Sequence, residues 1–368
     1  MHERIFLSPP HMSGREQEYI AEAFASNYIA PLGAFVERFE KNVREYVGAR
    51  HALATVNATA ALHLALRIVG VEADDIVLAS SFTFIGSVAP IHYQCATPIF
   101  IDSDEESWNL DPKLLKEAIM RAPKKPKALI VTHLYGQPAS IEEIAAICKE
   151  SGVVLIEDAA ESLGATYKDR QSGTFGDIGI YSFNGNKLLS TSGGGMLVTD
   201  NETYYEKASF YATQAKEDTL HYEHKEYGYN YRLSNILGAI GVAQTEVLDE
   251  RIAQARAVFN AYQKRLGDIE EVRFMPEIAY AKGNRWLTTL TLEHTDPATV
   301  IDALAQENIE ARPLWKPMHL QPLYTDAAAV TNGVGERLFA KGLCLPSGTQ
   351  LRSEQIDRIC EIVTRKLA

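Results

Sequence analysis

The sequence has little of what nucleic-acid binding requires. Lys and Arg number 36 against 48 Asp and Glu, and the formal net charge is −12 at pH 7. Neutralising a phosphate backbone needs basic surface, so we do not expect this acidic chain to bind DNA or RNA. The densest basic group, at residues 124–127, is interrupted by proline and indicates a solvated loop.

We also expect neither a signal peptide nor a membrane span. The chain opens Met1-His2-Glu3-Arg4, without the apolar run of a signal peptide. The stretch Ile76–Ile101 has no Asp, Glu, Lys or Arg, but a membrane helix would have to bury its many serines, threonines and prolines in hydrocarbon. We predict a strand, a short helix and a strand inside a core, in a cytoplasmic protein without membrane contact.

Cysteine and glycine patterns typical of common sites are absent. The four cysteines (Cys95, Cys148, Cys344 and Cys360) show neither metal-ligand nor CxxC spacing, so we expect buried free thiols and no metal site. The run at residues 193–195 is three glycines without the GxGxxG spacing of a dinucleotide fingerprint. What remains is a globular chain of 368 residues, 46% hydrophobic and 23% charged.

The sequence does contain a regular alternation of strand and helix patterns. Short β-rich runs occur at His51–Asn57, Ile76–Thr83, Pro98–Asp102, Ala128–Leu134, Val153–Asp158, Ile178–Phe183 and Met196–Thr199. Helical patterns between them include Ala58–Val69, Pro112–Arg121 and Ile141–Glu150. This alternation predicts an α/β fold with a largely parallel sheet covered on both faces.

The second part of the chain has a different organisation. A long helical pattern from about Leu233 to Leu266 is expected to bridge to a smaller C-terminal α/β unit. That unit has candidate strands at Arg285–Leu292 and Ile309–Leu314 and a last helix from about Ser353. We therefore predict a large domain in residues 1–250, including the N-terminal segment, and a small domain in residues 251–368.

Chemically useful residues follow three of the predicted strands. Open parallel sheets bind ligands at the carboxyl ends of their strands. Asp158 follows the strand at 153–157, Lys187 follows the strand at 178–182, and Ala58 and Thr59 open a helix after the strand at 51–56. These strand ends supply an acid, an amine and an anion site.

This combination suits pyridoxal phosphate. The cofactor needs a lysine amine for its Schiff base, a carboxylate that keeps its pyridine nitrogen protonated, and a cradle for its phosphate. Lys187 and Asp158 can supply the first two, and the free N–H groups at a helix start can supply the third. Ser182 can add a hydroxyl, and Phe84 is well placed to stack on the pyridine ring.

Each residue also has an ordinary structural explanation. An Asp after a strand is commonly a turn or cap residue, and a Lys in a loop rich in Gly and Asn is commonly a surface charge. Thr59 could be a simple helix cap. Three complementary groups in a fixed order favour the cofactor, but on spacing alone both interpretations stay open.

Longer segments around these residues resemble a known family. The segments are Asn57–Leu66, Glu157–Glu161, Tyr181–Lys187 with Gly193–Met196, and Gly228–Asn235. They are similar to the DegT/StrS-type sugar aminotransferases, and the resemblance covers nearly the whole chain. It implies the aspartate-aminotransferase (type I pyridoxal-phosphate) fold, with a large mostly parallel sheet domain and a smaller C-terminal α/β domain.

The resemblance also implies roles for single residues. Lys187 matches the Schiff-base lysine, Asp158 the partner of the pyridine nitrogen, Ser182 a phosphate ligand, and Ala58 and Thr59 the phosphate loop.

Three further positions match the family less simply. Asn230 matches an asparagine that reaches the phosphate of the neighbouring subunit, which implies a homodimer with shared active sites. His319 matches a histidine near the sugar nucleotide. Glu161 stands where many relatives have Gln or His beside the cofactor's ring oxygen, and a carboxylate there would repel a phenolate unless it is protonated or paired.

The substrate is suggested by segments outside the cofactor-binding core. Asn27–Leu32, His221–His224 and Arg312–His319 resemble aminotransferases of bacillosamine synthesis. This implies amino transfer from L-glutamate to a UDP-linked 4-keto-6-deoxy-N-acetylhexosamine. Arg312 or Arg232 could pair with the diphosphate. The candidate substrate-binding residues are Tyr28, Asn184, Arg232, Trp315, Met318 and His319.

Other functions remain open. The sequence distinguishes poorly between a UDP-linked substrate and a GDP- or dTDP-linked 4-keto or 3-keto sugar. Trp315, Arg232 and Arg312 could also be structural residues. A dehydratase of the same family would have His in place of Lys187. A non-enzymatic regulator would need a nucleic-acid module, which the sequence does not show.

Overall fold

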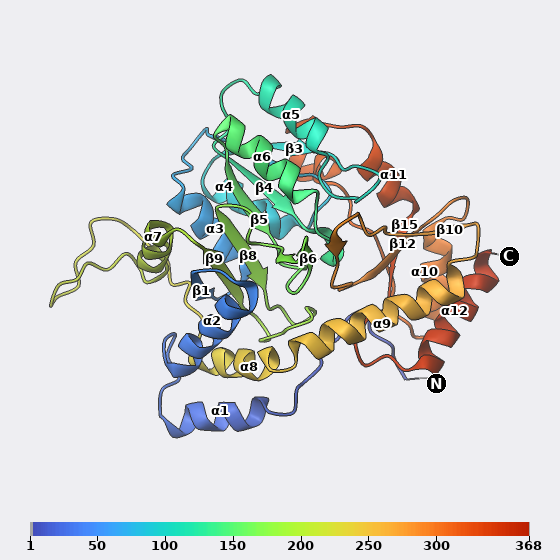
Figure 1. The fold of residues 1–368 in the computed structure, drawn as a ribbon, viewed down its shortest axis with the longest axis horizontal. Coiled ribbons are helices and arrows are strands. Elements are labelled where there is room, and N and C mark those ends of the chain that lie inside the picture. Colours follow the sequence, from blue (N-terminus) through green and yellow to red (C-terminus); the bar gives the residue numbers. More distant parts are fainter. Residues whose placement is uncertain (1–2, 368) are drawn as a thin grey trace.

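The computed structural model describes residues 3–367 and confirms the predicted α/β fold (Figure 1). Its largest sheet has eight strands in the order β1-β9-β8-β5-β4-β2-β3-β14. Neighbouring strands are parallel, except that β9 is antiparallel to both β1 and β8. The strands are β1 (His51–Thr55), β2 (Ile76–Ser80), β3 (Thr97–Ile101), β4 (Ala128–Thr132), β5 (Val154–Asp158), β8 (Ile178–Ser182), β9 (Gly195–Thr199) and β14 (Ala328–Val330).

Helices cover both faces of this sheet, as the apolar strands predict. In β2, Val77 and Ala79 pack into one core with α3, α4 and α7, while Ile76 and Leu78 pack into another with α5 and α6. Alternate side chains of a strand point to opposite faces, which is why one strand serves two cores. The second face is completed beside β1 by α2 and by α8 (Asn235–Thr245). The helices are α1 (Glu16–Ala25), α2 (Ala34–Val47), α3 (Ala58–Ile68), α4 (Ala89–Tyr93), α5 (Pro112–Arg121), α6 (Ile141–Ser151) and α7 (Glu202–Ala212).

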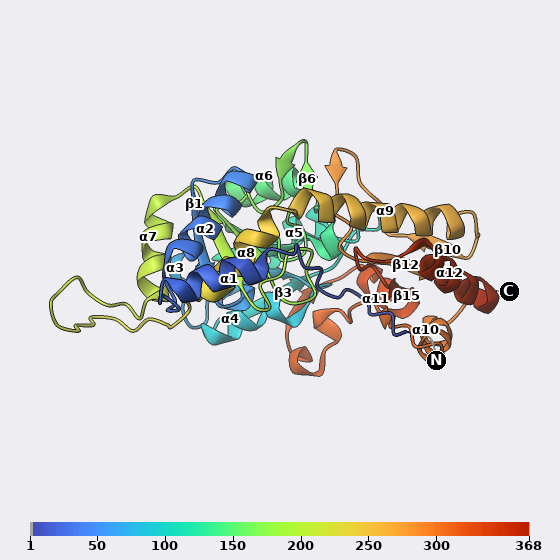
Figure 2. The same cartoon turned by 90° about the horizontal axis from the view of Figure 1, so that it is seen from below.

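The single long helix predicted from Leu233 to Leu266 is wrong, because the structure has two. These are α8 (Asn235–Thr245) and α9 (Leu248–Leu266). Ser234 caps α8, and Val247 has φ −118° and ψ 9°, which interrupts the helical hydrogen bonding between them. Helix α9 then runs from the large sheet to the second sheet, as Figures 1 and 2 show.

The second sheet has four strands in the order β10-β12-β15-β13, all antiparallel. They are β10 (Val272–Phe274), β12 (Thr288–Leu292), β13 (Arg312–Pro313) and β15 (Gly342–Leu345), packed with α10 (Pro297–Gln306) and α12 (Ser353–Leu367). The strand predicted to begin at Arg285 begins only at Thr288. Arg285 has φ +58°, which is incompatible with an extended strand.

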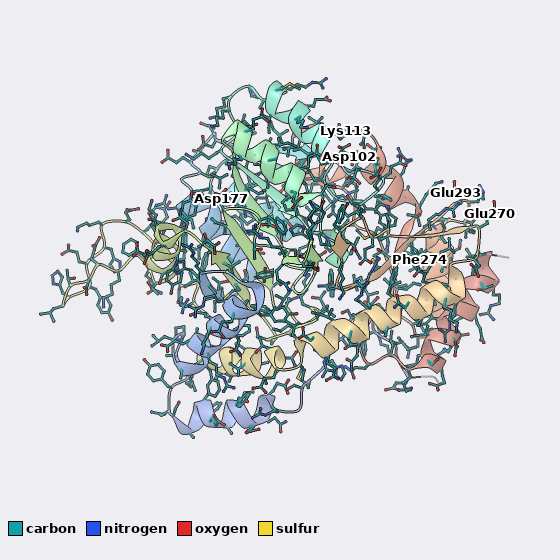
Figure 3. All side chains as sticks on the ribbon, viewed as in Figure 1. Asp102, Lys113, Asp177, Glu270, Phe274 and Glu293 are labelled. Atoms are coloured by element: carbon teal, nitrogen blue, oxygen red, sulfur yellow. The ribbon has the colours of Figure 1, made fainter. Side chains whose placement is uncertain are left out.

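Two segments cross the predicted division at residue 250, which itself stays a prediction. Ile5 forms a parallel bridge with Ile309 and belongs to the core of the four-stranded sheet. In the other direction, β14 joins the edge of the large sheet. Asp102, labelled in Figure 3, follows β3 and accepts hydrogen bonds from the N–H groups of Gly333 and Gly335, at 3.0 and 2.9 Å, at the start of α11 (Val334–Lys341).

The remaining elements are short. A small sheet has the order β11-β6-β7. Its strands and the 3-10 turns are β6 (Thr166–Tyr167), β7 (Arg170–Gln171), β11 (Ala281–Lys282), η1 (Ile85–Ser87), η2 (Leu134–Gly136), η3 (Met318–Leu320) and η4 (Pro322–Tyr324). The segment between α7 and α8 projects from the body in both views (Figures 1 and 2).

Three other expectations can be compared with the structure. The stretch Ile76–Ile101 forms β2, α4 and β3 as predicted, and no helix within residues 3–367 is long and apolar enough to cross a membrane. Cys148, Cys344 and Cys360 are buried free thiols, but Cys95 is exposed at the end of the α4 turn, so the expectation fails there. Among the described residues no His, Cys, Asp and Glu side chains gather as a metal site.

Candidate active site

One cavity of about 610 Å³ lies at the edge of the large sheet where the predicted strand ends meet. Strand β1 is antiparallel to β9, and β9 is antiparallel to β8, so β1 runs in the same direction as β8 and β5. Their carboxyl ends therefore share one edge. The predicted site residues that line this cavity are Ala58, Thr59, Phe84, Asp158, Glu161, Ser182, Asn184, Lys187 and Trp315.

Lys187 reaches into the cavity from the loop after β8. Its side chain is only 12% exposed, and its Nζ lies 3.5 Å from Oε1 of Glu161. Burial lowers the pKa of the Lys187 amine, while the nearby carboxylates of Glu161 and Asp158 act in the opposite direction. A buried amine that gives up its proton more readily than usual is suited to nucleophilic and base chemistry.

Asp158 is the last residue of β5 and is buried. It accepts a hydrogen bond from the Ala160 N–H at 3.1 Å and another from the Ser87 hydroxyl. Burial raises the pKa of Asp158, and these hydrogen bonds and the positive charge of Lys187 partly offset that rise. A carboxylate held in this way at the cavity wall can form an ion pair with a cationic ring nitrogen.

Glu161 stands beside these two residues. Its Oε2 accepts the Tyr135 N–H at 2.7 Å, and Tyr135 adopts a left-handed conformation (φ +51°) in making this contact. Burial raises the pKa of Glu161 to about 7, against the effect of the Lys187 amine. Near neutral pH the carboxyl can therefore carry a proton, which removes the repulsion expected between Glu161 and a phenolate. Its role toward the cofactor stays a prediction.

The start of α3 offers an anion site in the same cavity. The Asn57 side chain caps the helix by accepting the Ala60 N–H at 2.7 Å. Ala58 and Thr59 line the cavity, and the N–H groups of a first helical turn have no acceptor within the helix. Strand β9 passes so close that a Cβ at Gly195 would lie 2.5 Å from the Ala58 nitrogen. Glycine is therefore required at this position for β9 to pack against the helix start.

Five predicted residues do not line the cavity of this chain. Met318 is buried in the core beside Tyr324, and His319 bonds to Ser81 through Nδ1 at 2.6 Å. Arg232 pairs with Glu40 at 2.8 Å. The other two, Tyr28 and Asn230, are exposed on loops.

These placements bear differently on the predicted roles. Arg232 is engaged with Glu40 and the Ala54 carbonyl, and Met318 is only 2% exposed, which leaves a ligand almost no surface to contact. Asn230 is exposed, and its side chain accepts a hydrogen bond from Gln214 at 3.1 Å. An exposed residue is compatible with a contact to a second subunit, and the shared site stays a prediction.

The cavity also contains residues that sequence reasoning missed. Ser87 holds Asp158, and Trp286 lies against Lys187, with Nζ 3.7 Å from the ring centroid. Lys316 also lines the cavity, after the strand of the second sheet that carries Arg312. Arg312 was one of two sequence candidates for a diphosphate, and it is the one that lines the cavity, where it pairs with Glu310 at 2.9 Å. No local signal marked Trp286, because only the fold brings it to a lysine 99 positions earlier.

Comparisons with known proteins agree with this geometry. Residues 10–364 match the DegT/DnrJ/EryC1/StrS aminotransferase family, and the chain therefore belongs to that family. It is 53% identical to EpsN of Bacillus subtilis, described as a pyridoxal phosphate-dependent aminotransferase, over 99% of this chain and 96% of the relative. It is 36% identical to GDP-perosamine synthase of Escherichia coli O157:H7, over 96% of both chains. The structure of DesI with its TDP-sugar product has a TM-score of 0.91 and 25% identity, covering 99% of this chain and 93% of that one.

The class of protein follows from these findings. The chain is a pyridoxal-phosphate-dependent sugar aminotransferase with the type I fold, and pyridoxal phosphate is its cofactor. The finer resemblance to bacillosamine aminotransferases is not shown, since these relatives are named for GDP-perosamine and a TDP-sugar. The substrate of this chain is therefore a matter for proposal.

Proposed function

We propose that the chain transfers the amino group of L-glutamate to the 4-keto group of a nucleotide-linked 4-keto-6-deoxy sugar. The observation that carries the proposal is the cavity that Lys187, Asp158 and the start of α3 line together with the cationic residues Arg312 and Lys316. The first three suit the cofactor. The two cations suit substrates with carboxylate or phosphate groups, which an acidic protein must attract by local positive charge.

The residues present fit pyridoxal phosphate. The buried carboxylate of Asp158, the amine of Lys187, the helix start at Ala58 and the Ser182 hydroxyl all line one cavity. The cavity, at about 610 Å³, has room for the cofactor together with a sugar. When bound, the cofactor supplies an electron sink for the charge left by proton removal beside the reacting nitrogen.

The chain's own residues then have distinct tasks. Asp158 holds a proton on the ring nitrogen by its negative charge, and the Ser87 hydroxyl and Ala160 N–H keep that carboxylate in place. Lys187 moves a proton at its Nζ, and the lowered pKa of this amine favours that role. Phe84 and Trp315, with ring centroids 5.7 Å apart, give this part of the cavity an apolar lining, and Phe84 is 55% exposed and free to stack on a bound ring.

The proposed acceptor is a UDP-linked 4-keto-6-deoxy-N-acetylhexosamine. The support comes from the segments around residues 27–32, 221–224 and 312–319. Of these, the last places Arg312, Trp315 and Lys316 at the cavity. Trp315 can pack on a sugar ring or an acetyl methyl, and Arg312 can pair with a diphosphate. Segments 27–32 and 221–224 are largely exposed, so a role for them requires a second subunit.

A GDP-linked 4-keto sugar is the second candidate. The observation that favours it is the 36% identity to a GDP-perosamine synthase over nearly the full length of both chains. The two candidates share the same reaction and differ in the base and in the N-acetyl group.

A competition assay separates them. The purified chain is incubated with L-glutamate and an equimolar mixture of UDP-, dTDP- and GDP-linked 4-keto sugars, and the aminated products are measured by mass. The UDP-linked N-acetyl sugar is expected to have the highest kcat/KM, and Lys187→Ala is the control that forms no product. A higher kcat/KM for the GDP- or dTDP-linked sugar would overturn the UDP assignment, and no aminated product from any sugar would overturn the proposed function.

A further inference from the structure

Trp286 makes two separate contacts with the part of the chain that carries Lys187. Its indole Nε1–H donates a hydrogen bond of 2.7 Å to the carbonyl of Asn186, the residue before the lysine. The same carbonyl accepts a bond of 2.8 Å from the Ser8 hydroxyl. In addition, the Lys187 Nζ lies 3.7 Å from the centroid of the indole ring. One side chain therefore contacts both the main chain and the amine of the lysine.

The position of Trp286 is itself fixed by buried contacts. Its own N–H donates to Oδ1 of Asn284 at 2.9 Å, and the Asn284 Nδ2 donates to the carbonyl oxygens of Glu161 and Leu163 at 2.8 and 3.0 Å. The indole is 3% exposed and packs beside the ring of Tyr135. Because Asn284 ties Trp286 to the loop after β5, the indole is held in a constant position relative to Glu161.

We propose that Trp286 is a positioning residue for Lys187. Its indole N–H holds the main chain just before the lysine, and its ring face holds the protonated amine of the Lys187 side chain. The inference rests on the proposed function, since it assumes that Lys187 is the lysine that reacts with the cofactor. A lysine side chain has four rotatable bonds and loses considerable entropy when it is fixed. A ring face that attracts the ammonium reduces the positions open to it whenever it is not bonded to the cofactor.

The ring face acts together with charged and titratable groups from several elements. Those that act on the amine or line the same cavity are Asp158 at the end of β5, Glu161 after it, Arg312 in β13, Lys316, and Cys344 in β15. Burial lowers the pKa of the Lys187 amine, and the two carboxylates oppose that effect. The indole acts in the same direction as the carboxylates, because an aromatic face stabilises the cation and not the neutral amine. Removing the ring is therefore expected to lower the pKa of Lys187 further.

The test is the rate at which the full-length chain, freed of cofactor, captures added pyridoxal phosphate. Only the unprotonated amine reacts, so the pH midpoint of this rate reports the amine of Lys187. Capture is followed by the visible absorbance band between pH 6 and 10. Ionisations of pyridoxal phosphate itself are common to all variants, so differences between midpoints belong to the protein.

Three variants define the expected pattern. Trp286→Leu should move the midpoint down by about half a unit to 1.5 units, the shift that corresponds to a desolvated cation–π contact. Trp286→Phe keeps a weaker ring face and should therefore shift the pH midpoint less. Because phenylalanine has no N–H to donate to the Asn186 carbonyl, this variant should also capture pyridoxal phosphate about two- to tenfold more slowly. The matched control is Trp108→Phe, since Trp108 is also buried, at 5% exposed, in the same aromatic cluster but away from the cavity. It should leave the midpoint unchanged.

Each outcome has a defined meaning. A wild-type midpoint in a folded Trp286→Leu variant overturns the inference. If that variant does not fold by circular dichroism, Trp286→Phe decides, and a midpoint and rate equal to those of Trp108→Phe overturn it. If the wild-type chain forms no visible band, or if the band persists in Lys187→Ala, the assumption about Lys187 fails instead.

Discussion

Replacing Glu161 by glutamine is expected to change how the stability of the cofactor-free chain depends on pH. Burial raises the pKa of the Glu161 carboxyl from 4.5 to about 7. This difference, at about 1.4 kcal/mol per unit, corresponds to about 3 kcal/mol. Glutamine does not titrate, and it keeps an acceptor oxygen for the Tyr135 N–H, which donates to Oε2 at 2.7 Å.

The sign follows from the direction of the shift. A carboxyl whose pKa is higher in the folded than in the unfolded state contributes stability that is fully present below the unfolded value, 4.5. That stability is lost as the pH rises through about 7, because ionisation of the buried group then favours unfolding. Between pH 5 and 8 the wild-type chain should therefore lose stability relative to Glu161→Gln.

Thermal unfolding followed by circular dichroism measures this difference. A chain of 368 residues has an unfolding entropy of about 0.8 kcal/mol/K, so about 3 kcal/mol corresponds to about 4 °C in Tm. We expect the difference in Tm between Glu161→Gln and wild type to grow by about that amount from pH 5 to 8. The control is Glu206→Gln, since Glu206 is exposed on α7 and its replacement should leave the profile parallel to wild type. Parallel profiles for Glu161→Gln as well would refute the reasoning, and would mean that Glu161 is not desolvated in the folded chain.

Four further outcomes are expected. Lys187→Ala should abolish turnover and the visible absorbance band while the circular dichroism spectrum is unchanged; turnover at the wild-type rate would exclude this lysine. Asp158→Asn removes the charge that keeps the ring nitrogen protonated and should lower kcat about a hundredfold or more, and equal activity would mean that another carboxylate has this role. Mixed dimers of Lys187→Ala and Asn230→Ala subunits should recover activity, because one site then has both residues; no recovery in verified mixed dimers argues against a shared site. Gly195→Ala should destabilise the chain by about 1–3 kcal/mol in a denaturant titration, while Gly193→Ala, whose nearest contact would be 3.9 Å away, should not, and equal stability of the two would contradict the close packing of β9.

The sequence by itself determined the fold class and the cofactor end of the site. Apolar runs such as Ala128–Val131 indicated buried strands, and these strands form the centre of the large sheet. Asp158, Lys187 and the helix start at Ala58 each follow a strand directly, so their placement at one edge of a parallel sheet needed only strand order and direction. Such features depend on local spacing, which a single sequence displays.

Predictions that depended on longer-range packing were less complete. The pattern around Val247 was helical in hydrophobicity, yet the backbone there breaks the predicted helix in two, and the side chain of the preceding Glu246 pairs with Arg15 and Arg38. Arg285 resembled the start of a strand, but its left-handed conformation delays the strand to Thr288. Periodicity reports which face a residue prefers, and it does not report where a distant contact interrupts the element.

Only the tertiary structure decided which cations and aromatic rings surround the lysine, and in which protonation state the buried acids are held. Arg232 and Arg312 were equal candidates by type, and the fold pairs Arg232 with Glu40 while Arg312 reaches the cavity. The contact between Trp286 and Lys187 joins two parts of the chain that no local pattern connects. The pKa of Glu161 is raised because folding removes water from its carboxyl group, and the degree of desolvation is a property of the packed structure and not of neighbouring residues in the sequence.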